Sequence, residues 1–317
     1  MIKRTIDYFA YLVVRGVICV IQALPLDTCA YGSQMLAVLA HDILRIRRKV
    51  TKENLRLAFP DWTEEQRRGC VREMWAHLFL MICEIAHAPR KLHESNFRKH
   101  VQFHRKSDMI RYMLDVRPSL LVLGHFGNFE AAGFIAGLLG IPTFTIARDL
   151  DNPYLHKFIN DFRSMKGQFM LPKEGSTGRI QEVIDDGGNL ALLGDQSAGP
   201  KGCWVDFFGK PASCYKSLAV LTLVGGAPLV VMYCRRLRKP LHFEIGVQGI
   251  VDPADLPADI TGVRELTQWY NHMLEDMIRE APGQYWWLHR RWKGEPPKRQ
   301  RREKRIDLPA ASGKKAA

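Results

Sequence analysis

The sequence predicts an α/β protein in which helices flank a central sheet that is largely parallel or mixed, preceded by an N-terminal membrane-anchoring helix. Three observations support this fold class. Short apolar segments alternate with segments of helical period over residues 119–196, as strands and helices do in α/β sheets. An apolar run of seventeen residues occupies positions 8–24. The chain has 317 residues, 46% of them hydrophobic, and can therefore bury a large core.

The N-terminal run contains only Arg15 and Gln22 as strongly polar residues and ends at Pro25. It is marginal for crossing a hydrocarbon layer of about 30 Å, so a tilted span, a shallow interfacial anchor and an ordinary buried helix all stay open. A second apolar stretch completes segment 1–45 and is expected to form an amphipathic or buried helix. By the positive-inside rule, five basic residues place the globular part on the cytoplasmic side: Arg45, Arg47, Arg48, Lys49 and Lys52.

Residues 46–297 are expected to form one domain, because no convincing linker divides them. A helix is predicted from Thr63 to about Ala88, since two acidic residues occupy its first turn. Periodicity then predicts strands at 119–125, 143–148, 167–171 and 189–196, with helices at 129–140, 152–167 and 177–188. Further along it predicts a helix at 213–226, two strands at 228–237 and 241–250, and a long amphipathic helix at 262–281.

The formal net charge of +13 favours anionic partners such as a membrane, a phosphorylated lipid, nucleic acid or an acidic protein. Much of the excess lies in segment 298–317, which begins KRQRREKR and is expected to be a solvated, disordered tail. Seven cysteines without a C-x-x-C pair argue against a disulfide framework or a zinc site.

His125 and Glu130 are the candidate catalytic residues. His125 ends a predicted strand, and Glu130 lies five residues later in the first turn of the next helix. Ligands commonly bind at the carboxyl edge of parallel sheets, where His125 is expected to lie. At that position Glu130 could orient the imidazole. The imidazole could then take a proton from a hydroxyl that attacks an acyl thioester. Gly127 would let a substrate approach the backbone, and Asn128 offers an amide at the helix start.

The segment GHFGNFE resembles the H-x-x-x-x-(D/E) signature of the bacterial lipid A biosynthesis acyltransferases, within the lysophospholipid acyltransferase superfamily. Other segments are similar to the same family: NLRLAFP (54–60), an R-x-x-x-N-P context at Arg148, a D-Q-x-x-G-x-x-G block at 195–202 leading to DFFGKPA (206–212), and YWWLHRRWK (285–293). These landmarks cover roughly residues 6–297.

The resemblance implies that His125 is a general base with Glu130 as its partner, and that Arg148 contacts a substrate phosphate or the reacting centre. It also implies substrate-binding roles at Gly127, Asn128, Asp195, Gln196, Phe207 and Phe208.

Several of these residues have structural alternatives. Arg148 could pair with a neighbouring aspartate on a solvated loop, and Asp195 could cap a turn. Phe207 and Phe208 could belong to the core instead of an acyl-chain wall.

The resemblance implies an O-acyltransferase that moves a fatty acyl chain from acyl carrier protein to a hydroxyl of a lipid A precursor, at the cytoplasmic face of the inner membrane and without metal or cofactor. Two alternatives stay open: acyl-coenzyme A-dependent acylation of another glycolipid such as a phosphatidylinositol mannoside, and a non-catalytic lipid-binding protein. The aromatic and basic segment 286–292 suits a membrane interface, and no nucleic-acid partner is expected because no binding motif accompanies it.

Overall fold

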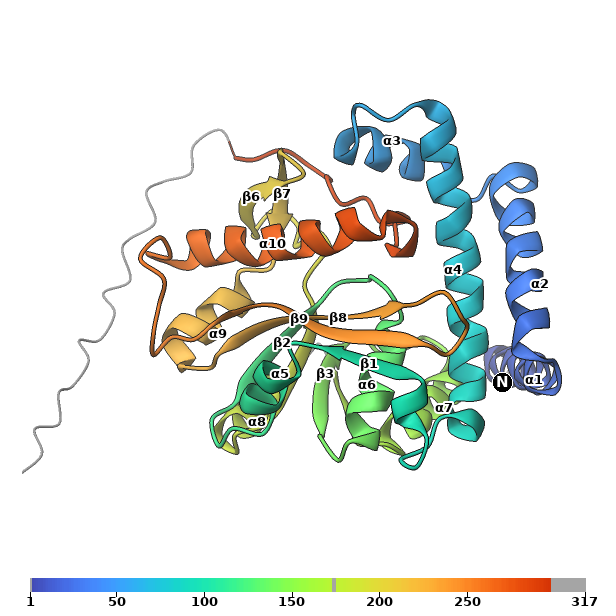
Figure 1. The fold of residues 1–317 in the computed structure, drawn as a ribbon, viewed down its shortest axis with the longest axis horizontal. Coiled ribbons are helices and arrows are strands. Elements are labelled where there is room, and N and C mark those ends of the chain that lie inside the picture. The colour runs from blue at the N-terminus through green and yellow to red at the C-terminus, as the bar shows by residue number, and fades with distance from the viewer. Residues whose placement is uncertain (1, 173–174, 298–317) are drawn as a thin grey trace, which may run out of the picture.

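A seven-stranded mixed sheet forms the centre of the molecule in the computed structural model, which describes residues 2–172 and 175–297 (Figure 1). The strand order is β1-β9-β8-β2-β5-β3-β4. Only β8 and β9 pair antiparallel; all other neighbours are parallel. The strands are β1 (Val101–His104), β2 (Ser119–Leu123), β3 (Thr143–Ala147), β4 (Gln168–Pro172), β5 (Asn189–Leu193), β8 (Leu229–Arg236) and β9 (Phe243–Val251). The predicted fold class is confirmed, whereas the predicted tail 298–317 lies outside the described residues.

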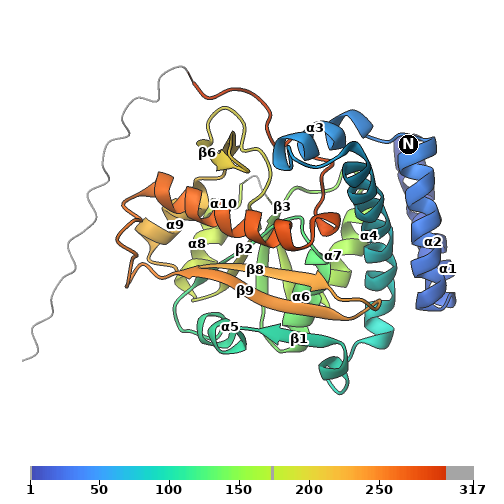
Figure 2. The same ribbon diagram turned by 45° about the horizontal axis from the view of Figure 1, so that its top comes forward.

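Helices cover both faces of this sheet. One face packs against α5 (Lys106–Met113), α6 (Phe129–Leu138) and α7 (Pro153–Ser164). The other packs against α8 (Thr177–Asp185), α9 (Ser217–Gly225) and α10 (Val263–Glu280), and Figure 2 shows α10 lying across it. Helix α7 begins where the sequence favours it, because the Asn152 side chain caps its first N–H groups and Pro153 fits the first turn.

The N-terminal third is helical. It comprises α1 (Ile2–Ala23), α2 (Leu26–Val38), a π-helical turn (Leu39–Ile43), α3 (Arg48–Ala58) and the long α4 (Glu64–Lys91). Helix α4 starts with the capping box of Thr63 and Gln66, which explains the predicted start. Helix α1 is the one described helix long and apolar enough to cross a membrane, and none of its residues is buried.

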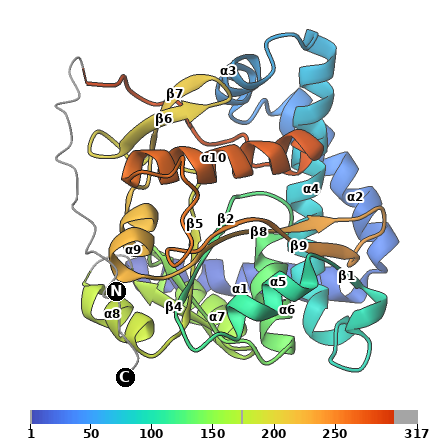
Figure 3. The same cartoon turned by 60° about the vertical axis from the view of Figure 1, so that its left-hand side comes forward.

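Five helices and strands were not predicted from the sequence: α3, β1, α5 and the two strands of a hairpin, β6 (Cys203–Phe207) and β7 (Lys210–Cys214). The hairpin forms a separate sheet that lies beside α10 (Figure 3). The buried Arg291 lies in the segment after α10 and links this segment to the hairpin. It donates hydrogen bonds to Ser213 O and Cys214 Sγ. The hairpin and the C-terminal segment therefore form one unit above the sheet.

Candidate functional site

The site centres on His125 and Asp195, which follow the neighbouring parallel strands β2 and β5. Leu123 is in register with Leu193, so the residues beyond each strand meet at the carboxyl edge of the sheet. His125 Nδ1 lies 2.8 Å from Asp195 Oδ1, and the His125 backbone N–H donates to Asp195 Oδ2 at 2.8 Å. Asp195 is only 2% exposed. The buried Asp195 carboxylate thus accepts two hydrogen bonds from His125. One holds the backbone of His125 in place, and the other fixes the tautomer of its ring.

Glu130 does not orient the imidazole, so the predicted contact between its carboxylate and the His125 ring is wrong. Its carboxylate forms a bidentate ion pair with Arg163 on α7. Glu130 lies on α6, which leads away from the ring, whereas Asp195 projects from the adjacent strand. The predicted role of Asp195 as a substrate ligand or turn cap changes accordingly, because it is the partner of the histidine.

The electrostatics of the pair suit a base that holds a proton temporarily. Burial on its own would lower the pKa of His125, but the charge and hydrogen bond of Asp195, with a further contribution from the charge of Glu130, raise the pKa above its ordinary value. Burial opposes ionisation of Asp195, yet its contacts with His125 lower the pKa of the carboxyl. An imidazolium formed during reaction is therefore stabilised.

Gln196 joins His125 to a second histidine, His289. The Gln196 amide nitrogen lies 3.1 Å from His125 Nε2 and 2.9 Å from His289 Nε2. Burial and the charges of His125 and Arg47 lower the pKa of His289, so its ring is neutral and can accept from the amide. The contact of Gln196 with the base supports its predicted place at the substrate. His289 was not predicted; its only signal was its position in the segment YWWLHRRWK.

Gly127 and Asn128 support the loop instead of facing a substrate. A Cβ at Gly127, where φ is +61°, would lie 2.0 Å from Cys234 O, so the close approach is to strand β8. Asn128 is fully buried; its side chain caps α6 through Ala131 N and donates to Glu84 at 2.9 Å. Both predictions of substrate contact are corrected, because protein atoms occupy those positions.

Phe207 and Phe208 also lie away from the cavity described below. They are buried in the core between the hairpin and the C-terminal segment, where Phe207 packs under Arg291 and Phe208 against Trp287. They do not form an acyl-chain wall.

Arg148 follows β3 at the same sheet edge as His125. It is 80% exposed and pairs with Asp151 at 3.2 Å, which is the solvated-loop alternative. Its contact with a substrate phosphate stays a prediction.

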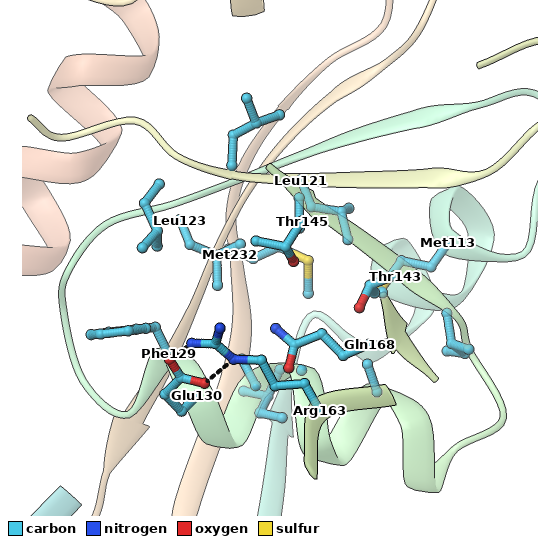
Figure 4. Close-up of a pocket in the computed structure, with 18 of the residues that line it drawn as sticks. Met113, Leu121, Leu123, Phe129, Glu130, Thr143, Thr145, Arg163, Gln168 and Met232 are labelled. Carbon is cyan, nitrogen blue, oxygen red and sulfur yellow. Dashed lines mark hydrogen bonds and ion pairs between the residues drawn. The ribbon is translucent and has the colours of Figure 1, made fainter. Parts of the chain in front are cut away.

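An apolar cavity of about 130 Å³ lies between α6 and the sheet. Phe129 connects it to the site, since its ring lines the cavity and lies 5.3 Å from that of His125. Figure 4 shows the Glu130–Arg163 pair near Phe129, with Gln168 drawn between that pair and Thr143. The cavity therefore reaches the site through Phe129, next to the histidine.

Comparison with known proteins gives the same assignment over nearly the whole chain. A family model described as bacterial lipid A biosynthesis acyltransferase matches residues 2–294. The lipid A biosynthesis palmitoleoyltransferase of Escherichia coli (strain K12) is 24% identical over 287 residues, which cover 89% of this chain and 90% of that protein. The lipid A biosynthesis lauroyltransferase of the same organism is 27% identical over 289 residues, with 89% and 90% covered. Because the family model matches residues 2–294, this protein belongs to the bacterial lipid A biosynthesis acyltransferases.

Proposed function

We propose that this acyltransferase moves a fatty acyl chain from acyl carrier protein to a hydroxyl of a lipid A precursor, with His125 as general base and Asp195 as its partner. The observation that carries the proposal is the His125–Asp195 pair at the carboxyl edge of the sheet, beside an apolar cavity. Glu130 contributes negative charge near the ring while it is paired with Arg163.

In the proposed reaction, the acceptor hydroxyl gives its proton to His125 Nε2 while its oxygen attacks the thioester carbonyl carbon. Asp195 stabilises the imidazolium that results. The tetrahedral intermediate then expels the carrier thiolate, which takes the proton back from His125 and leaves the ester. Gln196 is the nearest side-chain amide to the ring, and it is assigned to the substrate carbonyl.

The carrier-protein donor is supported by charge. Arg45, Arg48 and Lys49 are exposed and form no ion pair within the described part of the chain, and Arg47 donates to Leu288 O beside His289. Such a basic surface next to the site would attract an acidic carrier. The apolar surface of α1 supports a place at the inner membrane, with the site on the cytoplasmic face.

The test is an assay of purified protein with a lipid A precursor and either acyl carrier protein or coenzyme A thioesters. His125→Ala is expected to reduce transfer by about 10²- to 10⁴-fold without loss of fold. Mass spectrometry of lipid A from a deletion strain should show one acyl chain missing. Full activity of His125→Ala, or unchanged lipid A in the deletion strain, would contradict the proposal.

A further inference from the structure

A polar pocket of about 440 Å³ lies where the π-helical turn, α3 and the start of α4 meet (Figure 1). His41 and Arg67 line it, and His41 Nδ1 and Arg67 Nε are buried without a hydrogen-bond partner within residues 2–172 and 175–297. His41 as a whole is 6% exposed. Buried polar groups are normally paired, so two unpaired nitrogens at one pocket indicate a ligand or bound water.

Cations outnumber carboxylates around this pocket. The carboxylates of Glu64 and Asp42 each pair with more than one cation. Their lysine and arginine partners, at 2.6–3.3 Å, are Lys52, Arg56, Arg67, Arg68 and Arg72. Arg48 and Glu65 also line the pocket, and neither forms an ion pair in the part of the chain that the structure describes. Six cations therefore face three carboxylates, which favours a ligand of net negative charge.

The two unpaired nitrogens suit the oxygens of a phosphate. Arg67 Nη2 donates to Phe59 O at 2.9 Å and to Pro60 O at 2.7 Å, so the guanidinium is held in place while its Nε–H stays available. Burial lowers the pKa of His41, so its ring is neutral. Its Nε2 lies 4.0 Å from Asp42 Oδ1, beyond hydrogen-bond distance, so the proton can reside on Nδ1. Two N–H donors at one pocket can bind two oxygens of one phosphate.

The segment beside the pocket favours a phosphate that is carried by a lipid. Ile43, Leu44 and Ile46 follow His41 closely and are exposed. Helix α2 lies along the outer side of α4 and also carries exposed apolar side chains (Figure 1). The phosphates of a bilayer lie between its hydrocarbon and the water, so a basic pocket flanked by exposed apolar side chains can reach them.

We propose that this pocket binds the phosphate group of an anionic phospholipid of the bilayer, with Arg67 and His41 as hydrogen-bond donors. The residues that line it differ from those that contact His125, so this site is distinct from the catalytic one. The bound lipid would hold α3 at the bilayer surface. Because Asn54 on α3 donates to Trp287 O at 2.8 Å, the same lipid would also hold the segment that carries His289 near the membrane.

Sedimentation of the full chain with vesicles tests the site. Vesicles of phosphatidylcholine alone are compared with vesicles that also contain phosphatidylglycerol. His41→Leu should weaken binding to the mixed vesicles about tenfold, because a hydrogen bond to a charged group is lost, and should leave binding to phosphatidylcholine unchanged. The neutral ring carries no charge, so this change does not alter the general attraction between a basic surface and an anionic vesicle.

Two further variants serve as controls. His41→Asn places an amide N–H near the position of Nδ1 and should restore most of the binding to the mixed vesicles. His272→Leu is the same change as His41→Leu on the exposed surface of α10, and it should bind both kinds of vesicle as the parent does. Equal binding of the parent and of folded His41→Leu to the mixed vesicles would overturn the site.

Titrations in solution identify the source of the phosphate. A water-soluble, short-chain phosphatidylglycerol should bind the parent with saturation, and inorganic phosphate should bind much more weakly. Equal affinity for the two would indicate a site for free phosphate and would overturn the assignment to a lipid. Should His41→Leu not fold, the titration of the parent decides, since absence of saturation would overturn the site.

Kinetics separate this site from acceptor recognition. The KM of His41→Leu for the lipid A precursor, measured in detergent without phospholipid, should equal that of the parent. A KM raised about tenfold would assign the pocket to the acceptor and overturn its assignment to a bilayer phospholipid. The vesicle and titration measurements use no acyl donor, so their outcome does not depend on the proposed function.

Discussion

At the scale of single residues, the partner of His125 decides the pH dependence of the reaction. Because Asp195 raises the pKa of His125, kcat/KM should rise with pH as the ring loses its proton, with a midpoint above 6.5. Asp195→Asn removes the charge that raises this pKa, so the acid limb should move to lower pH while the maximal rate falls about 10²- to 10⁴-fold. The measurement is the pH profile of kcat/KM for the two proteins.

Glu130→Gln provides the comparison for this prediction. Its charge contributes less to the pKa of His125 than that of Asp195, so the limb should move by a smaller amount. A shift as large as that of Asp195→Asn would restore Glu130 as the functional partner of the ring.

The sequence singled out His125 but not the carboxylate that bonds to its ring, for a physical reason. Glu130 is five residues away along the chain, whereas Asp195 is 70 residues away and reaches the ring only because β5 pairs with β2. The D-Q block identified Asp195 as important, but its role depends on strand order, which periodicity does not contain. Likewise the sequence indicated that Gly127 and Asn128 matter but not which atoms they contact. The strand and the helix that contact them come from distant segments of the chain.

At the scale of elements, a buried network connects α4 to the loop that carries His125. Arg236 on β8 forms a two-bond ion pair with Glu84, at 2.6 and 2.7 Å, and donates to His77 Nδ1 at 2.6 Å. Burial and the charge of Arg236 lower the pKa of His77 to about 3, so the neutral ring donates through Nε2 to Gly127 O at 3.0 Å. Helix α4 therefore helps to position the loop that carries His125.

Glu84→Gln tests this network. Glu84 is fully buried, and breaking one side of a buried ion pair costs about 3–5 kcal/mol of unfolding free energy, which thermal or urea unfolding can measure. Transfer should also slow, because the loop loses a support. Asp161→Asn breaks an exposed pair with Lys157 on α7 and should change stability by only about 0.5 kcal/mol or less. Equal effects of the two changes would show that the network has no special role.

The strands and helices of the alternating region were predictable because each carries its own periodic signal, from β2 at Ser119 to β5 at Leu193. Elements with weak local signals were not. The four-residue β1 is too short to show alternation, and the β6–β7 hairpin turns through Phe208, a non-glycine residue with φ of +52°. These elements depend on distant contacts, such as those of Arg291 with the hairpin.

At the scale of the whole molecule, an apolar surface extends over the N-terminal helices. Phe9, Val13 and Val20 on α1 are 67%, 50% and 61% exposed, and Ile43 and Leu44 after α2 are 67% and 59% exposed. Exposed apolar side chains along one side of a helix, as on α1, are typical of membrane contact.

The opposite side of α1 contacts the body. Gln22 donates to Ala86 O at 2.7 Å, and Asn152 donates to Asp7 O at 2.8 Å. With one side against protein and the other exposed, α1 fits a helix lying at the membrane interface better than a free span.

The double variant Phe9→Asp/Val13→Asp tests whether this surface binds lipid. Loss of two buried apolar side chains should weaken binding by about 3 kcal/mol, or roughly 100-fold, because each contributes about 1.5–3 kcal/mol when removed from water. Sedimentation with phospholipid vesicles measures the effect. Val116→Asp is the control, because Val116 is 92% exposed in the loop between α5 and β2, away from the N-terminal helices. If both proteins sediment as the parent does, the apolar surface of α1 does not hold the enzyme at the membrane, and its acceptor must reach the site by another route.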